Sequence, residues 1–138
     1  LVAFLLPPKD AAITMLAYIG IGLIGVPVFT AGTSGPGKMF GPTGGYIWAY
    51  VVAVYLMSAL KGKTYNLKRY SLVAIVIGIP IIYLGGAIQL HFVTEMPWAA
   101  VITSGVLPFI PLDIVKSILA AILAKPLLNI IAIRNTQP

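Results

Sequence analysis

The stretch "LPFIPLDIVKSILAAILA" places a carboxylate and an ammonium group three residues apart in otherwise apolar sequence. On a helix, Asp113 and Lys116 share one face, because residues i and i+3 are neighbours there. Pro111 suits the first turn of such a helix, which puts Asp113 near the positive end of the helix dipole. A carboxylate accepts N–H donors, and an ammonium donates to a carbonyl or pairs with a carboxylate. The pair therefore predicts a site for a small polar ligand that carries a urea or amide group and an acid.

A structural alternative for the same two residues is an aspartate that caps the helix and a lysine that extends to the lipid headgroups. We favour ligand binding because a glycine-rich loop is expected on the same outer side. That loop, "TAGTSGPGKMFGPTGGY" over residues 30–46, is longer than a plain connector needs, and glycine allows the backbone to approach a ligand closely. It predicts a lid or binding loop more than a flexible connector. It lacks a "GxxxxGK[ST]" pattern, so it does not indicate a nucleotide site.

The composition sets the class of protein in which these residues act. Of the 138 residues, 59% are hydrophobic and 9% are charged, and the mean hydropathy is +1.01. The apolar residues come in long runs, which is typical of an integral membrane protein. There is no cysteine and a single histidine, His91, which excludes a disulfide framework, a thiolate site and a histidine-based metal centre. The net charge of +6 reflects membrane topology and not nucleic-acid binding, because the basic residues cluster at the ends of apolar runs.

The apolar runs predict an all-α membrane bundle of about four spans. A span needs ~20 residues to cross a ~30 Å hydrocarbon core. The second run is short for this and needs flanking residues or a thinned bilayer. The four expected spans cover residues 11–29, 45–60, 70–90, and 111 to at least 124.

Three further segments complete the expected organisation. Residues 1–6 resemble the end of a hydrophobic helix, so we expect a chain truncated at its N-terminus. Between the third and fourth spans, a short interfacial helix with Trp98 at headgroup level is expected. After the fourth span, Pro126 predicts a break, beyond which the chain either continues with a kink or lies along the membrane surface.

Basic residues predict the orientation. The loop "KGKTYNLKR", residues 61–69, carries four basic residues and no acid, so it is expected in the cytoplasm. Alternation of the spans then places Lys9 and Arg134 on the same side, and the loops 30–44 and 91–110 outside. A stripe of small residues at every fourth position allows close helix packing. The favoured interpretation is packing within the protein, and the alternative is contact with a partner membrane subunit. The stripe consists of Gly45, Ala49 and Ala53.

Three stretches, "GLIGVPVFTAG", "FGPTGGYIWAY" and "LPFIPLDIVKSILAAILA", resemble signature stretches of the BioY family, in the right order over nearly the whole chain. That family comprises the biotin-specific S-components of energy-coupling factor (ECF) transporters. The resemblance implies a single transmembrane domain over residues 1–138, equivalent to a six-helix bundle from the end of its second helix onward. It implies capture of biotin from outside the cell. It also implies delivery driven by a transmembrane coupling subunit and two cytoplasmic ATPase subunits, in the plasma membrane of a bacterium.

The resemblance also implies roles for particular residues. Asp113 and Lys116 would hold the bicyclic head of biotin, and Lys38 lies where a basic loop residue could meet the valerate carboxylate. The family usually has glycine where this chain has Leu112, a departure that leaves both charges in place. Further substrate contacts are expected from the loop motif. These are Phe40, Thr43, Gly44 and Tyr46.

Neither a cofactor nor a metal is expected, and the protein is expected not to be an enzyme. One alternative is an S-component for another vitamin, for which a pocket lined mainly by aromatic residues would point to a flavin or thiamine. Another is a small membrane enzyme acting on lipid, with Asp113, Glu95 and His91 as the only candidates for its chemistry. A channel is disfavoured because no span carries a repeated polar face.

Overall fold

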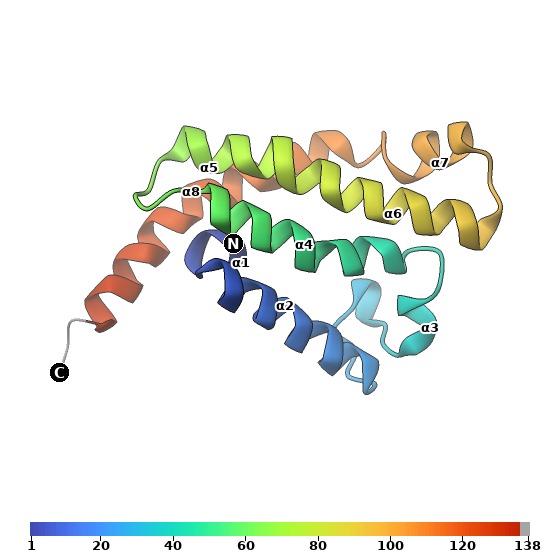
Figure 1. Ribbon diagram of the computed structural model, residues 1–138, viewed down its shortest axis with the longest axis horizontal. Helices are drawn as coiled ribbons and strands as arrows, with labels where there is room; N and C mark the ends of the chain where they lie inside the picture. The colour runs from blue at the N-terminus through green and yellow to red at the C-terminus, as the bar shows by residue number, and fades with distance from the viewer. Residues whose placement is uncertain (136–138) are drawn as a thin grey trace.

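Residues 1–135 of the chain are described by a computed structural model, and they form helices joined by turns, without a named strand (Figure 1). The all-α fold class predicted from the apolar runs is confirmed. In chain order the elements are α1 (Val2–Leu5), α2 (Pro8–Leu23), the short 3-10 turn η1 (Thr30–Gly32), α3 (Pro36–Met39), α4 (Gly44–Leu60), α5 (Leu67–Val73), the π-helical segment η2 (Ala74–Gly78), α6 (Ile79–Thr94), α7 (Trp98–Gly105) and α8 (Ile110–Asn135).

Helix α4 packs between α2 and α6, and small residues bring α4 and α6 into close contact (Figure 1). A Cβ added to Gly45 would collide with the backbone carbonyl of Gly85, and a Cβ added to Gly85 would lie 2.7 Å from the Cβ of Ala49. Ala53, the next residue of the same stripe, is completely buried. The favoured interpretation of this stripe, helix packing within the protein, is confirmed.

Helices α5 and α6 form one continuous helix with η2 between them, over residues Leu67–Thr94. The π-helical segment ends just before Pro80. Proline has no N–H to donate to the carbonyl four residues earlier, and its ring clashes with that carbonyl. The wider π-helical turn before Pro80 relieves this clash. Asn66 caps the N-terminus of this helix, where its side chain accepts a hydrogen bond of 3.0 Å from the backbone N–H of Arg69.

The first expected span was too long. Hydropathy continues through residue 29, but α2 ends at Leu23. Gly25 has a φ of 107°, which a right-handed helix does not allow, and Pro27 disfavours helical backbone at Val26. The chain therefore leaves the helix six residues earlier than its hydropathy indicates, and Phe29 folds back to pack its ring against Gly22.

The later part of the chain agrees more closely with expectation. The predicted short helix near Trp98 is α7, whose position at the headgroups stays a prediction. The break predicted at Pro126 is absent, because α8 continues through this residue to Asn135. The course of this part of α8 relative to a membrane stays a prediction. The second half of α8 diverges from the bundle in Figure 1.

Among residues 1–135, two helices are long and apolar enough to cross a membrane, Leu67–Thr94 with 28 residues and Ile110–Arg134 with 25. Helix α4 is also apolar but has 17 residues, and α2 has 16. Shorter helices of this kind need flanking residues or a locally thinner bilayer to span it. Together with the composition, these helices indicate a membrane protein, and the number of four spans remains a prediction.

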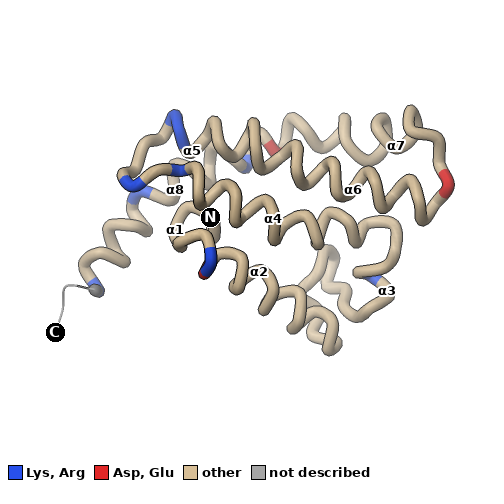
Figure 2. Tube along the Cα trace, in the orientation of Figure 1, with Lys and Arg blue, Asp and Glu red and all other residues tan. Residues whose placement is uncertain are grey.

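Basic residues gather at the end of the bundle where α4 meets α5, whereas α3, which carries Lys38, lies at the opposite end (Figure 2). At the basic end, the Lys61 ammonium donates to the carbonyls of Ala3, Phe4 and Leu6 at 2.8, 2.9 and 2.7 Å. The Ser58 hydroxyl also donates to Leu6, at 2.5 Å. Burial lowers the pKa of the Lys61 ammonium. These bonds fasten α1 to the end of α4.

Candidate binding site

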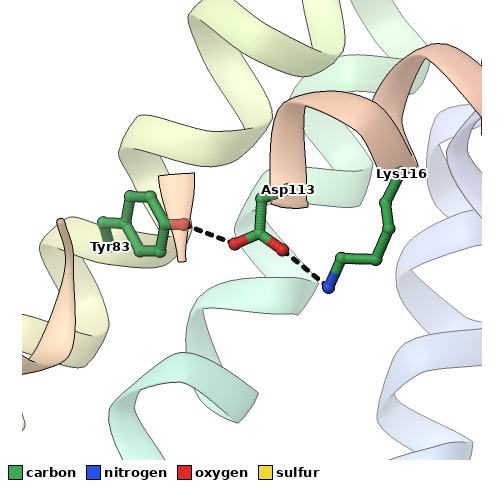
Figure 3. A network of polar contacts seen from close by, with 3 residues as sticks. All are labelled: Tyr83, Asp113 and Lys116. Atoms are coloured by element: carbon green, nitrogen blue, oxygen red, sulfur yellow. Dashed lines mark hydrogen bonds and ion pairs between the residues drawn. The ribbon is translucent and has the colours of Figure 1, made fainter. Parts of the chain in front are cut away.

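Asp113 lies in the first turn of α8 between two donors, one on each of its carboxylate oxygens (Figure 3). The Lys116 Nζ is 2.6 Å from Oδ1, and the Tyr83 hydroxyl, from α6, donates to Oδ2. The backbone N–H of Asp113 donates to the carbonyl of Phe109 at 2.9 Å, which closes the first turn of α8. The Asp113 side chain is 26% exposed and that of Lys116 is 63% exposed. The carboxylate is thus held between α6 and α8 while the ammonium remains accessible.

The Asp113–Lys116 pair lies deeper in the helical bundle than its position near the start of a span suggested. Tyr83, which bonds Asp113, is eleven residues before the end of α6, about 16 Å along the helix at ~1.5 Å per residue. The reason is that α7 and the turn at residues 106–109 already carry the chain back along α6 before α8 begins. The pair therefore lies near the start of α8 but well inside the bundle, and the assignment of that end of α8 to the outer side stays a prediction.

A cavity of about 460 Å³ opens beside this pair, within the ~300–1,000 Å³ range typical of small-molecule sites. It is walled by α4, α6, α7, the start of α8 and the glycine-rich loop. Asp113 and Lys116 provide its charged groups on α8, and Lys38 provides one from α3. Apolar side chains, among them Ile47 and Leu90, line the space between.

A second cavity of about 280 Å³ meets the first at the same residues. It extends toward Phe4 and Met57, so it lies on the side of the bundle where α1 packs. The residues that line both cavities are Tyr50, Ile82, Tyr83, Asp113 and Lys116. The charged pair and the two tyrosines therefore form the boundary between an outer and an inner space.

The predicted site residues divide into two groups. Lys38, Thr43 and Tyr46 line the outer cavity together with the charged pair, and the Tyr46 hydroxyl donates to the carbonyl of Gly105 at 2.6 Å. Phe40 and Gly44 do not line it. The Phe40 side chain is 68% exposed and its ring centroid lies 6.3 Å from that of Trp48.

Gly44 has a packing role in place of a cavity-lining one. It is buried where α4 begins, and a Cβ added there would collide with the backbone carbonyl of Met39. The same Cβ would lie 2.6 Å from the side-chain nitrogen of Gln89. Glycine is required at this position because the loop backbone passes directly over the start of α4.

The glycine-rich loop is fastened to the helices at several points. The Gln89 side chain donates to the carbonyls of Met39 and Gly41 at 2.9 and 2.7 Å. The backbone N–H of Gly35 donates to the carbonyl of Gly22 at 2.8 Å. Met39 is completely buried, so it anchors α3 in the bundle. These contacts hold the pocket-lining side chains of the loop in place; a closing movement of the loop over a ligand stays a prediction.

Sequence reasoning did not identify Tyr50, Tyr83 or Gln89. Tyr50 follows Tyr46 by four residues, so both share a helix face, and this spacing could have indicated it. Tyr83 is an isolated hydroxyl within the apolar run "IPIIYLGG", and a polar group inside a membrane span is a signal for function or for a specific partner. Gln89 gave no local signal, because its two acceptors are backbone groups 48 and 50 residues away.

The described residues contain no cluster of side chains suited to binding a metal ion. Among residues 1–135, no three or more histidine and acidic side chains lie close enough together to hold an ion. His91 Nδ1 instead bonds the carbonyl of Met96 at 2.7 Å, and its ring stacks on Trp98 with centroids 4.2 Å apart. His91 thereby connects α6 to α7.

An all-helical membrane bundle with a partly polar, ligand-sized cavity defines a small-molecule-binding membrane protein. The model of the BioY family matches residues 1–133, and the chain belongs to this family. It is 33% identical to "Biotin transporter BioY2" of Lactococcus lactis subsp. cremoris, with 98% of this chain and 74% of the relative aligned. It is 32% identical to "Biotin transporter BioY" of Thermotoga maritima, with 88% of this chain and 71% of the relative aligned.

A solved structure is similar to this chain over most of its length. It is the crystal structure of the S-component for biotin from an ECF-type ABC transporter, with a TM-score of 0.83 and 31% sequence identity. The match covers 91% of this chain and 69% of the other. The helical arrangement described above is therefore that of an S-component.

Proposed function

We propose that this protein is the biotin-binding S-component of an ECF transporter, capturing biotin from outside a bacterial cell at the plasma membrane. Import would then require a transmembrane coupling subunit and two cytoplasmic ATPase subunits. Membership of the BioY family supports the proposal, and so do the names of the two relatives, which are those of biotin transporters. The structural neighbour, an S-component for biotin, supports the same class.

The observation that carries the proposal is the Asp113–Lys116 pair at one cavity with Lys38. A ureido group offers two N–H donors and one carbonyl acceptor, which match a carboxylate and an ammonium group. At its other end biotin carries a carboxylate, for which Lys38 provides the complementary charge. From Thr43 to Tyr50, two residues that line the same cavity, α4 rises roughly 10 Å, so the cavity is elongated enough for a head and a tail.

The cavity lining also bears on the alternatives. Four of its fourteen lining residues are aromatic, which is less than the mainly aromatic surface expected for a flavin or thiamine. For a lipid-directed enzyme, the candidate acid Asp113 would need a base within reach. In the described part of the chain its bonded partners are Tyr83 and Lys116, whereas His91 bonds Met96.

Calorimetric titration of the purified protein with biotin, thiamine and riboflavin tests the proposal. We expect biotin to bind, and thiamine and riboflavin not to bind. We also expect mass spectrometry to identify biotin as the small molecule that co-purifies with the protein. Binding of another vitamin in place of biotin, or hydrolysis of lipid by protein that binds no vitamin, would overturn it. Reconstitution in vesicles with and without the energising module then tests the partners, since ATP-dependent uptake should require that module.

A further inference from the structure

Tyr83 stands out among the residues around the charged pair, because the family resemblance gave it no role and yet it bonds the carboxylate directly (Figure 3). It is 8% exposed, and Asp113 lies thirty positions later in the chain. The question is what this hydroxyl contributes that Lys116 does not.

The two donors to Asp113 differ in rigidity. Lys116 holds its charge at the end of a flexible four-carbon stem, and its side chain is 63% exposed. Tyr83 has a planar ring that is buried between helices, so its hydroxyl has few alternative positions. Its helix is itself held against α4, where Gly85 meets Ala49 and a Cβ on Gly86 would collide with the ring of Tyr46. Of the two donors to the carboxylate, Tyr83 is therefore the more rigidly held.

The direction of the hydrogen bond also has a chemical consequence. An ionised carboxylate only accepts hydrogen bonds, at about four lone-pair sites over its two oxygens. Tyr83 takes a site on Oδ2 and Lys116 takes one on Oδ1, which leaves acceptor capacity on each oxygen but no donor. A ligand atom that approaches Asp113 must then be a donor, and the fixed plane of the carboxylate determines from which direction it can donate.

On the basis of the proposed function, we propose that Tyr83 is a positioning residue that makes the site selective for a ligand head with a free N–H. It acts through Asp113, by fixing the plane of the carboxylate against the cavity. A site that hydrogen-bonds a ligand N–H discriminates strongly against analogues lacking that donor, because a buried acceptor is then left unpaired. Without Tyr83, the carboxylate can turn toward other partners and this discrimination weakens.

The test compares the Tyr83→Phe variant with the parent for two ligands, biotin and a biotin derivative methylated on one ureido nitrogen. Phenylalanine keeps the ring and removes only the hydroxyl. We expect biotin affinity to fall about tenfold, equivalent to ~1.4 kcal/mol, and the preference for biotin over the methylated derivative to fall by a similar factor. Tyr55→Phe is the matched control, because Tyr55 is 44% exposed on the same bundle and does not line the cavity, and it should change neither value.

A double-mutant cycle separates action through Asp113 from a direct contact with the ligand. In an Asp113→Asn background, Tyr83→Phe should have little further effect on biotin affinity, because the two residues form one network. Tyr50→Phe, at the same cavity boundary, should add its effect independently. Additive effects of Tyr83→Phe and Asp113→Asn would overturn the positioning role, as would unchanged affinity and unchanged preference in Tyr83→Phe.

A measurement without ligand distinguishes failure of this inference from failure of the proposed function. Infrared difference spectra of Tyr83→Phe against the parent should show a shift of a carboxylate band that is absent in the Asp113→Asn background. If the difference spectrum shows this shift but the parent does not bind biotin, the proposed function is overturned and the hydrogen bond from Tyr83 to Asp113 stands. If the parent binds biotin but the difference spectrum shows no shift, the inference alone is overturned.

Discussion

The side chain of Gln89, on α6, donates a hydrogen bond of 2.9 Å to the backbone carbonyl of Met39, at the end of α3. A second bond from the same amide reaches Gly41 at 2.7 Å. One side chain thereby ties the segment before α4 to the helix that carries Tyr83. Because Lys38 and Thr43 flank this attachment and line the outer cavity, Gln89 is one of the contacts that hold them in place relative to Asp113.

Replacing Gln89 with leucine tests this attachment. The variant keeps the approximate size of the side chain and removes both hydrogen bonds, each of which contributes ~1 kcal/mol. We expect amide hydrogen exchange over residues 36–45 to become at least about tenfold faster, and biotin to bind more weakly. Mass spectrometry of the exchanged protein measures the first effect and calorimetry the second.

Thr94→Val provides the control for this experiment, because its hydroxyl donates to Leu90 in the same helix and accepts from the Met96 N–H just after it, and neither residue belongs to the loop. It should leave exchange over residues 36–45 at the parent rate. Adding biotin to the parent should slow exchange in the loop if the loop closes over the ligand. Exchange as slow in Gln89→Leu as in the parent would contradict the role given to Gln89.

The contact between α4 and α6 predicts a large difference between two Gly→Ala changes. At Gly45 the added methyl group meets the carbonyl of Gly85, so either the helices move apart or the backbone shifts. Overpacking of this kind costs about 1–3 kcal/mol, and the melting temperature in detergent should fall. At Gly20 in α2 the same methyl group has no neighbour within 4 Å, so Gly20→Ala should leave the melting temperature unchanged or raise it. Equal melting temperatures for both variants would show that α4 and α6 are not in close contact.

The orientation of the bundle is tested with single cysteines, which are simple to interpret because the chain has none of its own. A cysteine at Thr64, in the basic loop, should react with an impermeant reagent only after the membrane is permeabilised. Thr64 is preferable to Asn66, whose side chain caps α5. A cysteine at the exposed Phe40 position should react in intact cells. Reversed labelling would place the outer cavity on the cytoplasmic side.

The sequence predicted the features that depend on local spacing. Asp113 and Lys116 are three residues apart on one helix, so their ion pair could be predicted without knowledge of the fold. The small-residue stripe of α4 was predictable for the same reason. The end of α2 was missed because the prediction followed hydropathy, although Gly25 and Pro27 in "IGVPVF" are local signals for the end of a helix.

Features that depend on how distant segments meet could not be predicted. Tyr83 reaches Asp113 because α8 packs against α5 and η2, which continue into α6, and no spacing in the sequence encodes that contact. In the loop, Met39 and Phe40 are both large and apolar, and the sequence does not say which one is buried. Met39 occupies the interior and Phe40 is 68% exposed, so the aromatic residue predicted as a ligand contact lies outside the cavity.

Lys38 tests the assignment of the tail end of the cavity. Replacing Lys38 with methionine removes the charge and keeps most of the stem, so the acid of biotin loses its complementary partner. An ion pair at a partly exposed position contributes up to ~1 kcal/mol, so biotin should bind roughly fivefold more weakly. Biotinamide, which has no carboxylate, should bind the variant and the parent equally. A loss of the same size for both ligands would indicate that Lys38 supports the loop and does not recognise the acid.

The head end of the cavity is tested by changing the charged pair. Asp113→Asn keeps the shape but replaces an anionic acceptor with a neutral amide, and hydrogen bonds to charged groups contribute roughly 1.5–3 kcal/mol. Biotin affinity should therefore fall by about one to two orders of magnitude, measured by calorimetry. Lys116→Met should weaken binding comparably, because it removes the ammonium donor. The variant should still fold, because the Lys116 side chain is 63% exposed and methionine keeps the volume of its stem.

The double variant distinguishes a ligand-binding pair from a helix cap. Each charge partly neutralises the other, at 2.6 Å, and an unpaired charge within a membrane costs ~2.5–3.5 kcal/mol on insertion scales. Removing one partner strands the other, so the double change should cost less binding free energy than the sum of the single changes. Parent-like biotin affinity in both single variants would mean that Asp113 only caps α8 and that Lys116 only extends toward the headgroups. The hydrogen bond from Tyr83 to Asp113 argues against a capping role alone, because a carboxylate that only caps a helix needs no donor from another helix.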